Sequence, residues 1–246
     1  MSSPRTAPYQ DKDTIEACPS KNCIEQLETQ GHYRRPIPGE YQPQRPLPGN
    51  HALANPSPLG LLSFATGIFV LSMLGVHTRS IEQPNMAIGV LLCFGGICQF
   101  LSGIMEFING NKFGATVFPS YGAFNLSFAM IFLPGTGIQA AYTNANGDIN
   151  STFYDAVGVY CWAWFILTVI YTIAAVRSSW VLFTTLLLLC VELLLLAVGY
   201  MLRSDPVLVA GNSVGFVVAF CSYWAGCAAL WADLTPLNIR TFPMDG

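Results

Sequence analysis

Six apolar stretches, each of roughly twenty residues, occupy most of the chain between residues 59 and 232. An α-helix needs about 20 apolar residues to cross the hydrocarbon core of a bilayer, which is about 30 Å thick. The third stretch contains Pro119 and Asn125, and the fifth is broken only by Glu192. The predicted spans are residues 59–77, 85–105, 115–133, 156–176, 181–202 and 207–232. The sequence therefore predicts an all-α membrane protein, built as a six-transmembrane-helix bundle.

The composition excludes several other classes of protein. Only 10% of the residues are charged and 52% are hydrophobic, whereas soluble domains carry about 25% charged residues. The net charge of −3 provides no basic surface for a nucleic acid. There is no P-loop and no H-E-x-x-H zinc motif, and the three histidines (His32, His51 and His77) do not have the spacing of metal ligands. We therefore expect no enzymatic activity and no nucleic acid, cofactor or metal as a partner.

Charge and proline gather in the first 54 residues, which hold 12 of the 25 charged side chains and eight of the 16 prolines. No sustained apolar period runs through this segment, so we expect a disordered tail. The chain is then divided into this tail (1–54), a six-helix domain (55–234) and a short C-terminal tail (235–246).

The basic residues predict the orientation of the chain in the membrane. Six spans place both termini on one side, and with the tails inside, nine Lys or Arg are cytoplasmic and only two lie outside. This agrees with the excess of positive charge on cytoplasmic segments. The loop 134–155 contains no Lys or Arg, and its Asn150-Ser151-Thr152 is an N-glycosylation acceptor. We expect both tails in the cytoplasm and Asn150 outside.

Two polar segments flank the first three spans. Asn55 and Pro56 stand at the start of the first span. Asn is a strong N-terminal cap of a helix, and the free N–H groups at the start of a helix attract anions. The alternative interpretation is that Asn55 and Pro56 only cap the helix at the membrane surface. Glu106 ends the second span, within the Gly- and Asn-rich segment 103–116, where its carboxylate can reach the membrane interface. The alternative is an interfacial turn with an acid beside it.

Glu192 lies in the middle of the fifth span, within CVELLLLAVG. A charge at the centre of a transmembrane helix costs about 2.5–3.5 kcal/mol on insertion scales, and such residues usually face a bundle interior or a water-filled path. Two interpretations remain open: a proton-linked residue of a solute path, and a neutral Glu hydrogen-bonded between helices.

Two long motifs resemble the acetate transporter family, which includes the bacterial succinate–acetate permeases and the fungal acetate and ammonia-export proteins. They are NPSPLGLLSF at residues 55–64 and GGICQFLSGIMEFINGNKFGATVFPSYGAF at residues 95–124. A weaker similarity is present in LLAVG at residues 195–199 and in the WADLTPLNI ending. The N-terminal extension and the HTR turn after the first span resemble the fungal branch.

The resemblance implies a hexameric ring of six-helix subunits with one path per subunit, in the plasma membrane. It implies transport of acetate and similar small monocarboxylates, generally coupled to protons in fungi. It also implies an aromatic–aromatic–aliphatic constriction, which falls on Phe64, Tyr121 and Leu189. Asn55, Pro56 and Glu106 match family positions that are linked to activity.

The fifth span contains both Leu189 of the implied constriction and the intramembrane Glu192. Positions i and i+3 share a helix face, so Glu192 follows Leu189 by one turn along the same face. We therefore expect Glu192 and Glu106 to be candidates for proton coupling, and the Tyr121 hydroxyl and the Asn55 amide to bond the substrate carboxylate. Two alternatives remain: an ammonium or ammonia exporter, and a membrane sensor or developmental factor that transports nothing.

Overall fold

The computed structural model describes residues 54–81, 85–232, 234–237 and 239–244, which are nearly all helical. Within these ranges, six helical segments of 19 to 27 residues are long and apolar enough to cross a membrane. The elements are α3 (Ser57–Gly75), η1 (Thr78–Ser80), α4 (Asn85–Leu92), the π-helical turn η2 (Cys93–Cys98), α5 (Gln99–Ile108), α6 (Lys112–Phe132), η3 (Ala140–Tyr142), α7 (Ser151–Ala174), η4 (Ala175–Arg177), α8 (Trp180–Leu202) and α9 (Asp205–Trp231). The second of the six segments consists of α4, η2 and α5. The predicted six-helix membrane bundle is confirmed.

The predicted and observed spans agree to within a few residues. The largest difference is at α7, which begins at Ser151, five residues before the predicted start at 156. Hydropathy marks only the part of a helix that lies in hydrocarbon, whereas the hydrogen-bonded backbone continues into polar turns at either end. The predicted tail 1–54 lies outside the described residues except for Ala54.

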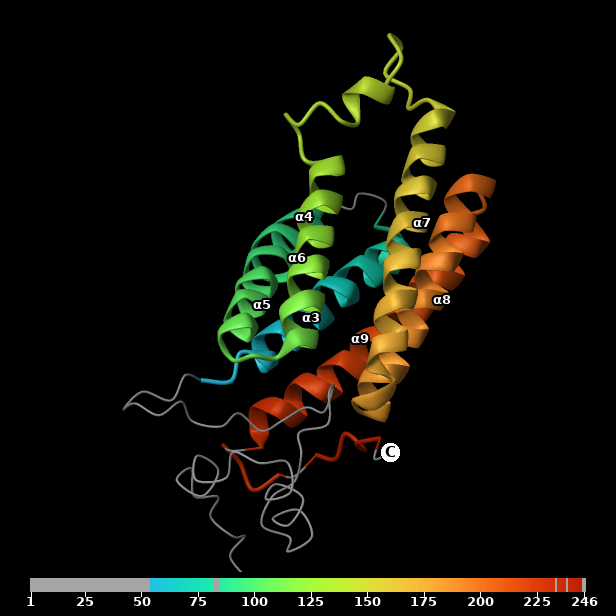
Figure 1. Ribbon diagram of the computed structural model, residues 1–246. Coiled ribbons are helices and arrows are strands. Elements are labelled where there is room, and N and C mark those ends of the chain that lie inside the picture. The colour runs from blue at the N-terminus through green and yellow to red at the C-terminus, as the bar shows by residue number, and fades with distance from the viewer. Residues whose placement is uncertain (1–53, 82–84, 233, 238, 245–246) are drawn as a thin grey trace, which may run out of the picture.

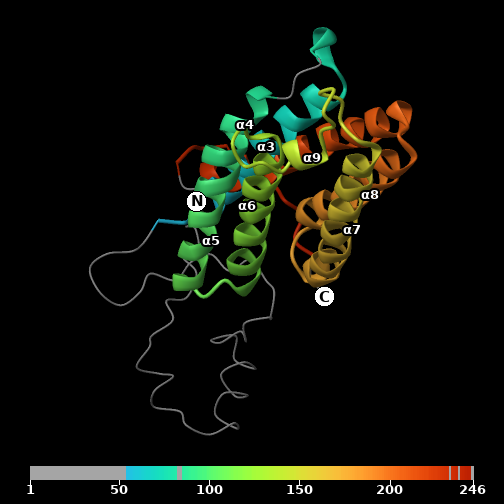
Figure 2. The same ribbon diagram turned by 90° about the horizontal axis from the view of Figure 1, so that it is seen from above.

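The first and last helices of the bundle pack side by side. Helix α3 contacts α9, α9 contacts α8, α8 contacts α7, and α5 forms a hairpin with α6 (Figure 1). Seen from above, α7 and α8 lie on one side of the molecule and α4, α5 and α6 on the other (Figure 2). We call the end with the α6–α7 loop (residues 133–150) the loop end, and the opposite one the terminal end.

Both ends of the described chain lie at the terminal end of the bundle (Figure 1). The C-terminal residues fold back onto the turn between α7 and α8. There the backbone N–H of Trp180 donates to the Phe242 carbonyl at 2.9 Å, and that of Met244 donates to the Ser178 carbonyl at 3.1 Å. An even number of spans requires both ends of the described helical domain to lie on one side.

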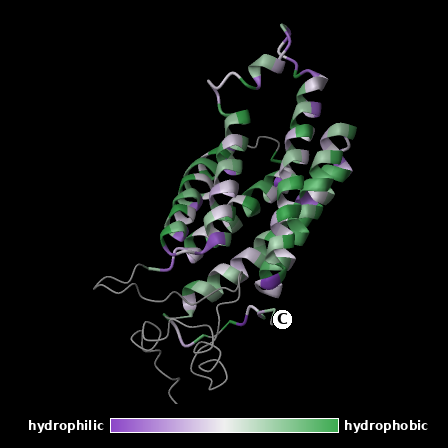
Figure 3. Cartoon of the chain, in the orientation of Figure 1, coloured by the Kyte–Doolittle hydropathy of each residue, from purple (hydrophilic) through white to green (hydrophobic). Residues whose placement is uncertain are grey.

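Large apolar side chains cover the outer faces of the helices. Phe107 on α5, Ile173 on α7 and Phe220 on α9 are each more than half exposed. The helices are hydrophobic along their length, and hydrophilic residues gather in the α6–α7 loop and at the helix ends (Figure 3). An apolar band of this extent is stable against lipid and unfavourable in water. The chain is an integral membrane protein.

The two residues that weakened the third predicted span are accommodated by packing. Pro119 lies against Gly103 of α5, where a Cβ atom would collide with the proline ring. Asn125 is buried and its amide donates to the Gly95 carbonyl of the π-helical turn at 2.8 Å. A π-turn leaves backbone carbonyls outside the α-helical pattern, so it supplies the acceptor that a buried Asn needs.

Candidate functional site

A cavity of about 590 Å³ opens towards the loop end of the bundle. Its lining on α3 extends from Phe64 to Gly75, on α6 from Tyr121 to Phe132, and on α8 from Leu189 to Tyr200. These three helices run from the terminal end towards the loop end, so the first residue on each is the deepest. His77, Tyr154 and Asp205 line the mouth. We call this cavity the vestibule.

The three residues of the expected constriction form the floor of the vestibule. Phe64, Tyr121 and Leu189 come from three different helices and belong to one buried cluster. The ring centroids of Phe64 and Tyr121 are 5.4 Å apart, and Leu189 is 2% exposed. Beyond them, towards the terminal end, the same cluster continues through Val117, Tyr171, Ala175 and Leu186. The vestibule therefore ends at the floor, where tight packing begins.

The Tyr121 hydroxyl has a hydrogen-bond partner within the protein. It donates to Oγ1 of Thr168 on α7 at 2.9 Å, and that hydroxyl donates in turn to the Trp164 carbonyl at 2.8 Å. A phenol has one proton to donate. In this arrangement that proton is donated to Thr168. The ring, packed against Phe64, is what Tyr121 presents to the vestibule.

An aromatic wall was missed by the analysis of the sequence. Phe124 and Phe128 on α6 stack at 5.6 Å, and Trp164 on α7 meets Phe124 edge-on at 5.1 Å. All three line the vestibule. The signal was available, since aromatic residues recur at 121, 124, 128 and 132, which is the spacing of one helix face. The sequence alone cannot say whether such a face meets lipid, a core or a cavity.

Glu192 lies in the vestibule wall, one turn outward from Leu189, and is 3% exposed. Among the described residues, its Oε2 atom has no hydrogen-bond partner, and neither has the hydroxyl of Ser72 on α3. The two side chains are neighbours, because a Cβ atom on Gly215 of α9 would contact both Ser72 Oγ and Glu192 Oε1. No Lys or Arg is found in the described lining of the vestibule.

A second polar cluster lies at the terminal end and does not line the vestibule. Glu106 is fully buried and accepts hydrogen bonds from the Ser57 hydroxyl and, at 2.9 Å, from the Asn111 amide. Its carboxylate is therefore enclosed by protein. The Asn55 side chain accepts from the Ser57 N–H at 3.0 Å, and the Pro56 carbonyl accepts from the Ser102 hydroxyl at 2.7 Å. The cluster joins α3, α5 and α6.

One short motif in α9 has the letters of a hydrolase site without its geometry. Residues 211–215 (GNSVG) fit the G-x-S-x-G pattern, which in hydrolases forms a sharp strand-to-helix turn that exposes the serine. Here the five residues continue a regular helix, and the exposed Ser213 hydroxyl donates to the Val209 carbonyl at 2.7 Å. Gly211 and Gly215 instead let α9 approach α8 closely.

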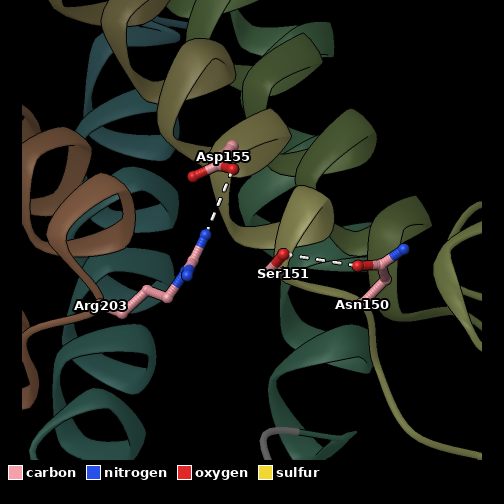
Figure 4. Close-up of polar contacts among 4 residues, drawn as sticks. All are labelled: Asn150, Ser151, Asp155 and Arg203. Atoms are coloured by element: carbon pink, nitrogen blue, oxygen red, sulfur yellow. Dashed lines mark hydrogen bonds and ion pairs between the residues drawn. The ribbon is translucent and has the colours of Figure 1, made fainter.

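The glycosylation candidate Asn150 lies at the loop end, immediately before α7 (Figure 4). Asn150 and Ser151 are exposed, and the Ser151 hydroxyl donates to the Asn150 side-chain oxygen at 3.4 Å. Nearby, Asp155 and Arg203 form an ion pair at 3.4 Å with both side chains about half exposed (Figure 4). Such exposed pairs contribute only about 0–1 kcal/mol. Asn150 is exposed, while its backbone N–H donates to the Tyr142 carbonyl at 2.7 Å.

These features define a class of protein. A six-helix membrane bundle with an apolar, aromatic vestibule that ends at three converging side chains is the architecture of a transporter or channel for small solutes.

The chain belongs to the GPR1/FUN34/yaaH family, whose model matches residues 37–246. It is similar to "Acetate permease A" of Emericella nidulans, with 39% identity over 204 residues, which cover 79% of this chain and 68% of the relative. It is also similar to "Ammonia transport outward protein 2" of Saccharomyces cerevisiae, with 35% identity over 73% of this chain and 62% of the relative.

Similarity extends to a bacterial relative. The "Succinate-acetate/proton symporter SatP" of Escherichia coli K12 is 31% identical over 69% of this chain and 84% of that protein. A solved structure described as that of the bacterial acetate channel SatP superposes with a TM-score of 0.66 at 26% identity, covering 76% of this chain and 99% of the other.

Proposed function

We propose that this protein carries acetate and similar small monocarboxylates across a membrane by way of the vestibule and its floor. The observation that carries the proposal is the convergence of Phe64, Tyr121 and Leu189 from three helices at the inner end of a cavity. Membership of a family that includes a fungal acetate permease supports the choice of substrate.

The lining of the path is suited to a small acid with one apolar end. Phe64, Leu189 and the aromatic wall offer contact to a methyl group and limit the size of what passes. The described lining has no Lys or Arg, so binding is weak enough for release. The same property makes the path unsuited to multivalent anions, which need fixed positive charge to leave water.

Proton coupling belongs to the same proposal, with Glu192 as the group that carries the proton. It is the acid in the wall of the vestibule at mid-membrane depth, whereas Glu106 is enclosed at the terminal end. The name of the bacterial relative, a proton symporter, supports coupling. Replacement of Glu192 by Gln removes the titrating group and keeps the shape, so the pH dependence of uptake should change.

Location and assembly complete the proposal. We place transport in residues 55–234, the loop end outside the cell, and both tails in the cytoplasm of the plasma membrane. Assembly into a homo-oligomer, a hexamer by resemblance to the acetate transporter family, is part of the same proposal. The exposed apolar faces of α5, α7 and α9 are available for contacts with lipid or with further copies.

Uptake of labelled acetate by the full chain in proteoliposomes, with and without an imposed proton gradient, tests the function. Gradient-driven accumulation is the expected result. Leu189→Trp should fill the floor and stop the flux, whereas Leu187→Trp, on the lipid-facing side of the same helix, should leave it intact. Equal loss in both variants would show that damage to α8, and not closure of the path, stops transport.

The alternatives give different results in the same vesicles. An ammonium exporter moves labelled methylammonium and not acetate. A sensor moves neither, and deletion of residues 1–50 should abolish its output, while a transporter keeps its flux after that deletion. Absence of acetate uptake from correctly folded protein would overturn the proposed function.

A further inference from the structure

The surroundings of Glu192 point to a role more specific than carrying a proton. The inference about this role rests on the proposed function. We infer that its carboxyl group is a docking subsite for the undissociated carboxyl group of a short monocarboxylic acid, and that the Ser72 hydroxyl positions it from behind. The subsite lies in the vestibule wall, one helical turn outward from the floor.

Two buried side-chain oxygens have no hydrogen-bond partner among the described residues. Buried polar side chains are hydrogen-bonded in the large majority of cases, so an exception needs an explanation. Here there are two neighbouring ones on facing helices: Oε2 of Glu192 on α8 and Oγ of Ser72 on α3. Glu192 lines the vestibule, whereas Ser72 is fully buried behind it. The carboxyl group therefore faces the vestibule on one side and the buried hydroxyl on the other.

The absence of a side chain at Gly215 creates the space for this arrangement. A Cβ atom there would contact Ser72 Oγ and Glu192 Oε1 together. Helix α9 therefore passes close enough for the Ser72 hydroxyl and the Glu192 carboxyl group to occupy the space that a side chain at this position would fill. A larger residue at this position would force the two polar groups to shift.

The chemistry favours a neutral acid over the anion. An undissociated carboxyl group has one O–H donor and a carbonyl acceptor, and a protonated Glu192 offers the complementary pair. An acetate ion can only accept hydrogen bonds, and no Lys or Arg in the described lining offsets its charge beside an acid.

The groups around Glu192 do not supply that positive charge. No titratable side chain of α4 lines the vestibule, and His77, which follows α3, lies at the mouth. Positive charge is absent from the other titratable side chains of the described lining: Tyr121 on α6, Tyr154 on α7, Tyr200 on α8 itself and Asp205 on α9. Cys161 on α7, which lies near Glu192, is not cationic either.

The position of the subsite orients the solute. Glu192 and Leu189 are three residues apart, which is about 4.5 Å along a helix axis. This is comparable with the length of a two-carbon acid. A carboxyl group docked on Glu192 leaves the methyl group facing Leu189 and the aromatic floor, which is the end that should enter the constriction first.

Four variants of the full chain in proteoliposomes test the inference, with KM and kcat for labelled acetate and inhibition by acetamide as readouts. Acetamide has the size of acetic acid, both hydrogen-bonding functions and no charge. Glu192→Gln retains a donor and an acceptor, so its KM should stay within about twofold and acetamide should still compete. Glu192→Leu should raise the KM for acetate about tenfold, with kcat little changed, and weaken acetamide to a similar degree.

Ser72→Ala tests the positioning role and should raise KM about threefold without changing kcat. Its matched control is Ser213→Ala, a serine on the exposed face of α9, which should match the wild type. A wild-type KM in Glu192→Leu overturns the subsite. Competition by methylammonium that disappears in both Glu192 variants also overturns it, because the carboxyl group would then bind a cation.

Failure of the proposed function remains distinguishable from failure of the subsite. If the wild type moves no acetate, the transport proposal fails, and thermal melting of the purified protein then decides on the subsite, since a bound ligand raises the melting temperature. Stabilisation by acetamide in the wild type and in Glu192→Gln, but not in Glu192→Leu, supports the subsite. No difference among the three overturns it.

Discussion

Tyr121 shows how much one hydrogen bond changes the interpretation of a residue. Its hydroxyl proton goes to Thr168 and its ring forms the floor of the vestibule with Phe64. The ring is the part of the side chain that faces the vestibule, and the hydroxyl links α6 to α7. The position was recognisable from the sequence motif, but the direction of the hydroxyl was not.

Tyr121→Phe therefore should have little effect on transport. The ring and its contact with Phe64 stay, and Thr168 retains its own bond to the Trp164 carbonyl. The loss of one neutral hydrogen bond should lower stability by about 1 kcal/mol. The KM for acetate, measured in proteoliposomes, should change less than twofold. A tenfold rise in KM with normal thermal stability would instead assign the hydroxyl to the substrate.

At the scale of the elements, the buried cluster around Glu106 fixes how α3 meets the α5–α6 hairpin. The carboxylate on α5 accepts from Ser57, which begins α3, and from Asn111, which precedes α6. Three segments that are separate in the sequence are thereby held at one point. We expect replacement of Glu106 to lower the stability of the bundle and to leave the affinity for the substrate unchanged.

Glu106→Ala should accordingly destabilise the bundle. It leaves the buried Ser57 hydroxyl unpaired, at about 1–3 kcal/mol, and the partly buried Asn111 amide unpaired at a smaller cost. Glu106→Gln, which still has an acceptor for Asn111 and a donor for Ser57, should retain most of the stability. Thermal melting in detergent measures the difference, and the folded fraction of each should show a wild-type KM for acetate. Normal melting of Glu106→Ala with lost proton stimulation would make Glu106 the coupling residue.

At the scale of the whole molecule, the orientation in the membrane can be tested through the α6–α7 loop. Asn150 is exposed and ends the α6–α7 loop, which lies opposite both ends of the described chain (Figure 1). In a eukaryotic host, Thr152→Ala should remove an N-linked glycan and speed migration on a gel, and Ser151→Ala, which preserves the acceptor motif, should not. Identical migration of all three proteins before and after enzymatic deglycosylation would contradict an outside loop.

The sequence by itself determined that this is a six-helix membrane protein. Hydropathy is a local property, so twenty-residue apolar stretches predict helices without any knowledge of their neighbours. The bounds were close for the same reason, and the error at α7 arose where the helix continues into the polar segment Ser151–Asp155. The motifs at 55–64 and 95–124 already pointed to the family that the comparisons later established.

Tertiary structure alone decided where the two intramembrane acids face. From the sequence, Glu106 and Glu192 were equal candidates for proton coupling, because a position along a helix does not state which way the side chain faces. The rotation of each helix is determined by packing, and here that packing encloses Glu106 between α3 and α6 and turns Glu192 to the vestibule. The pairing of Glu192 with Ser72 across Gly215 likewise exists only once α3, α8 and α9 are assembled, since no pattern within one helix records its partners.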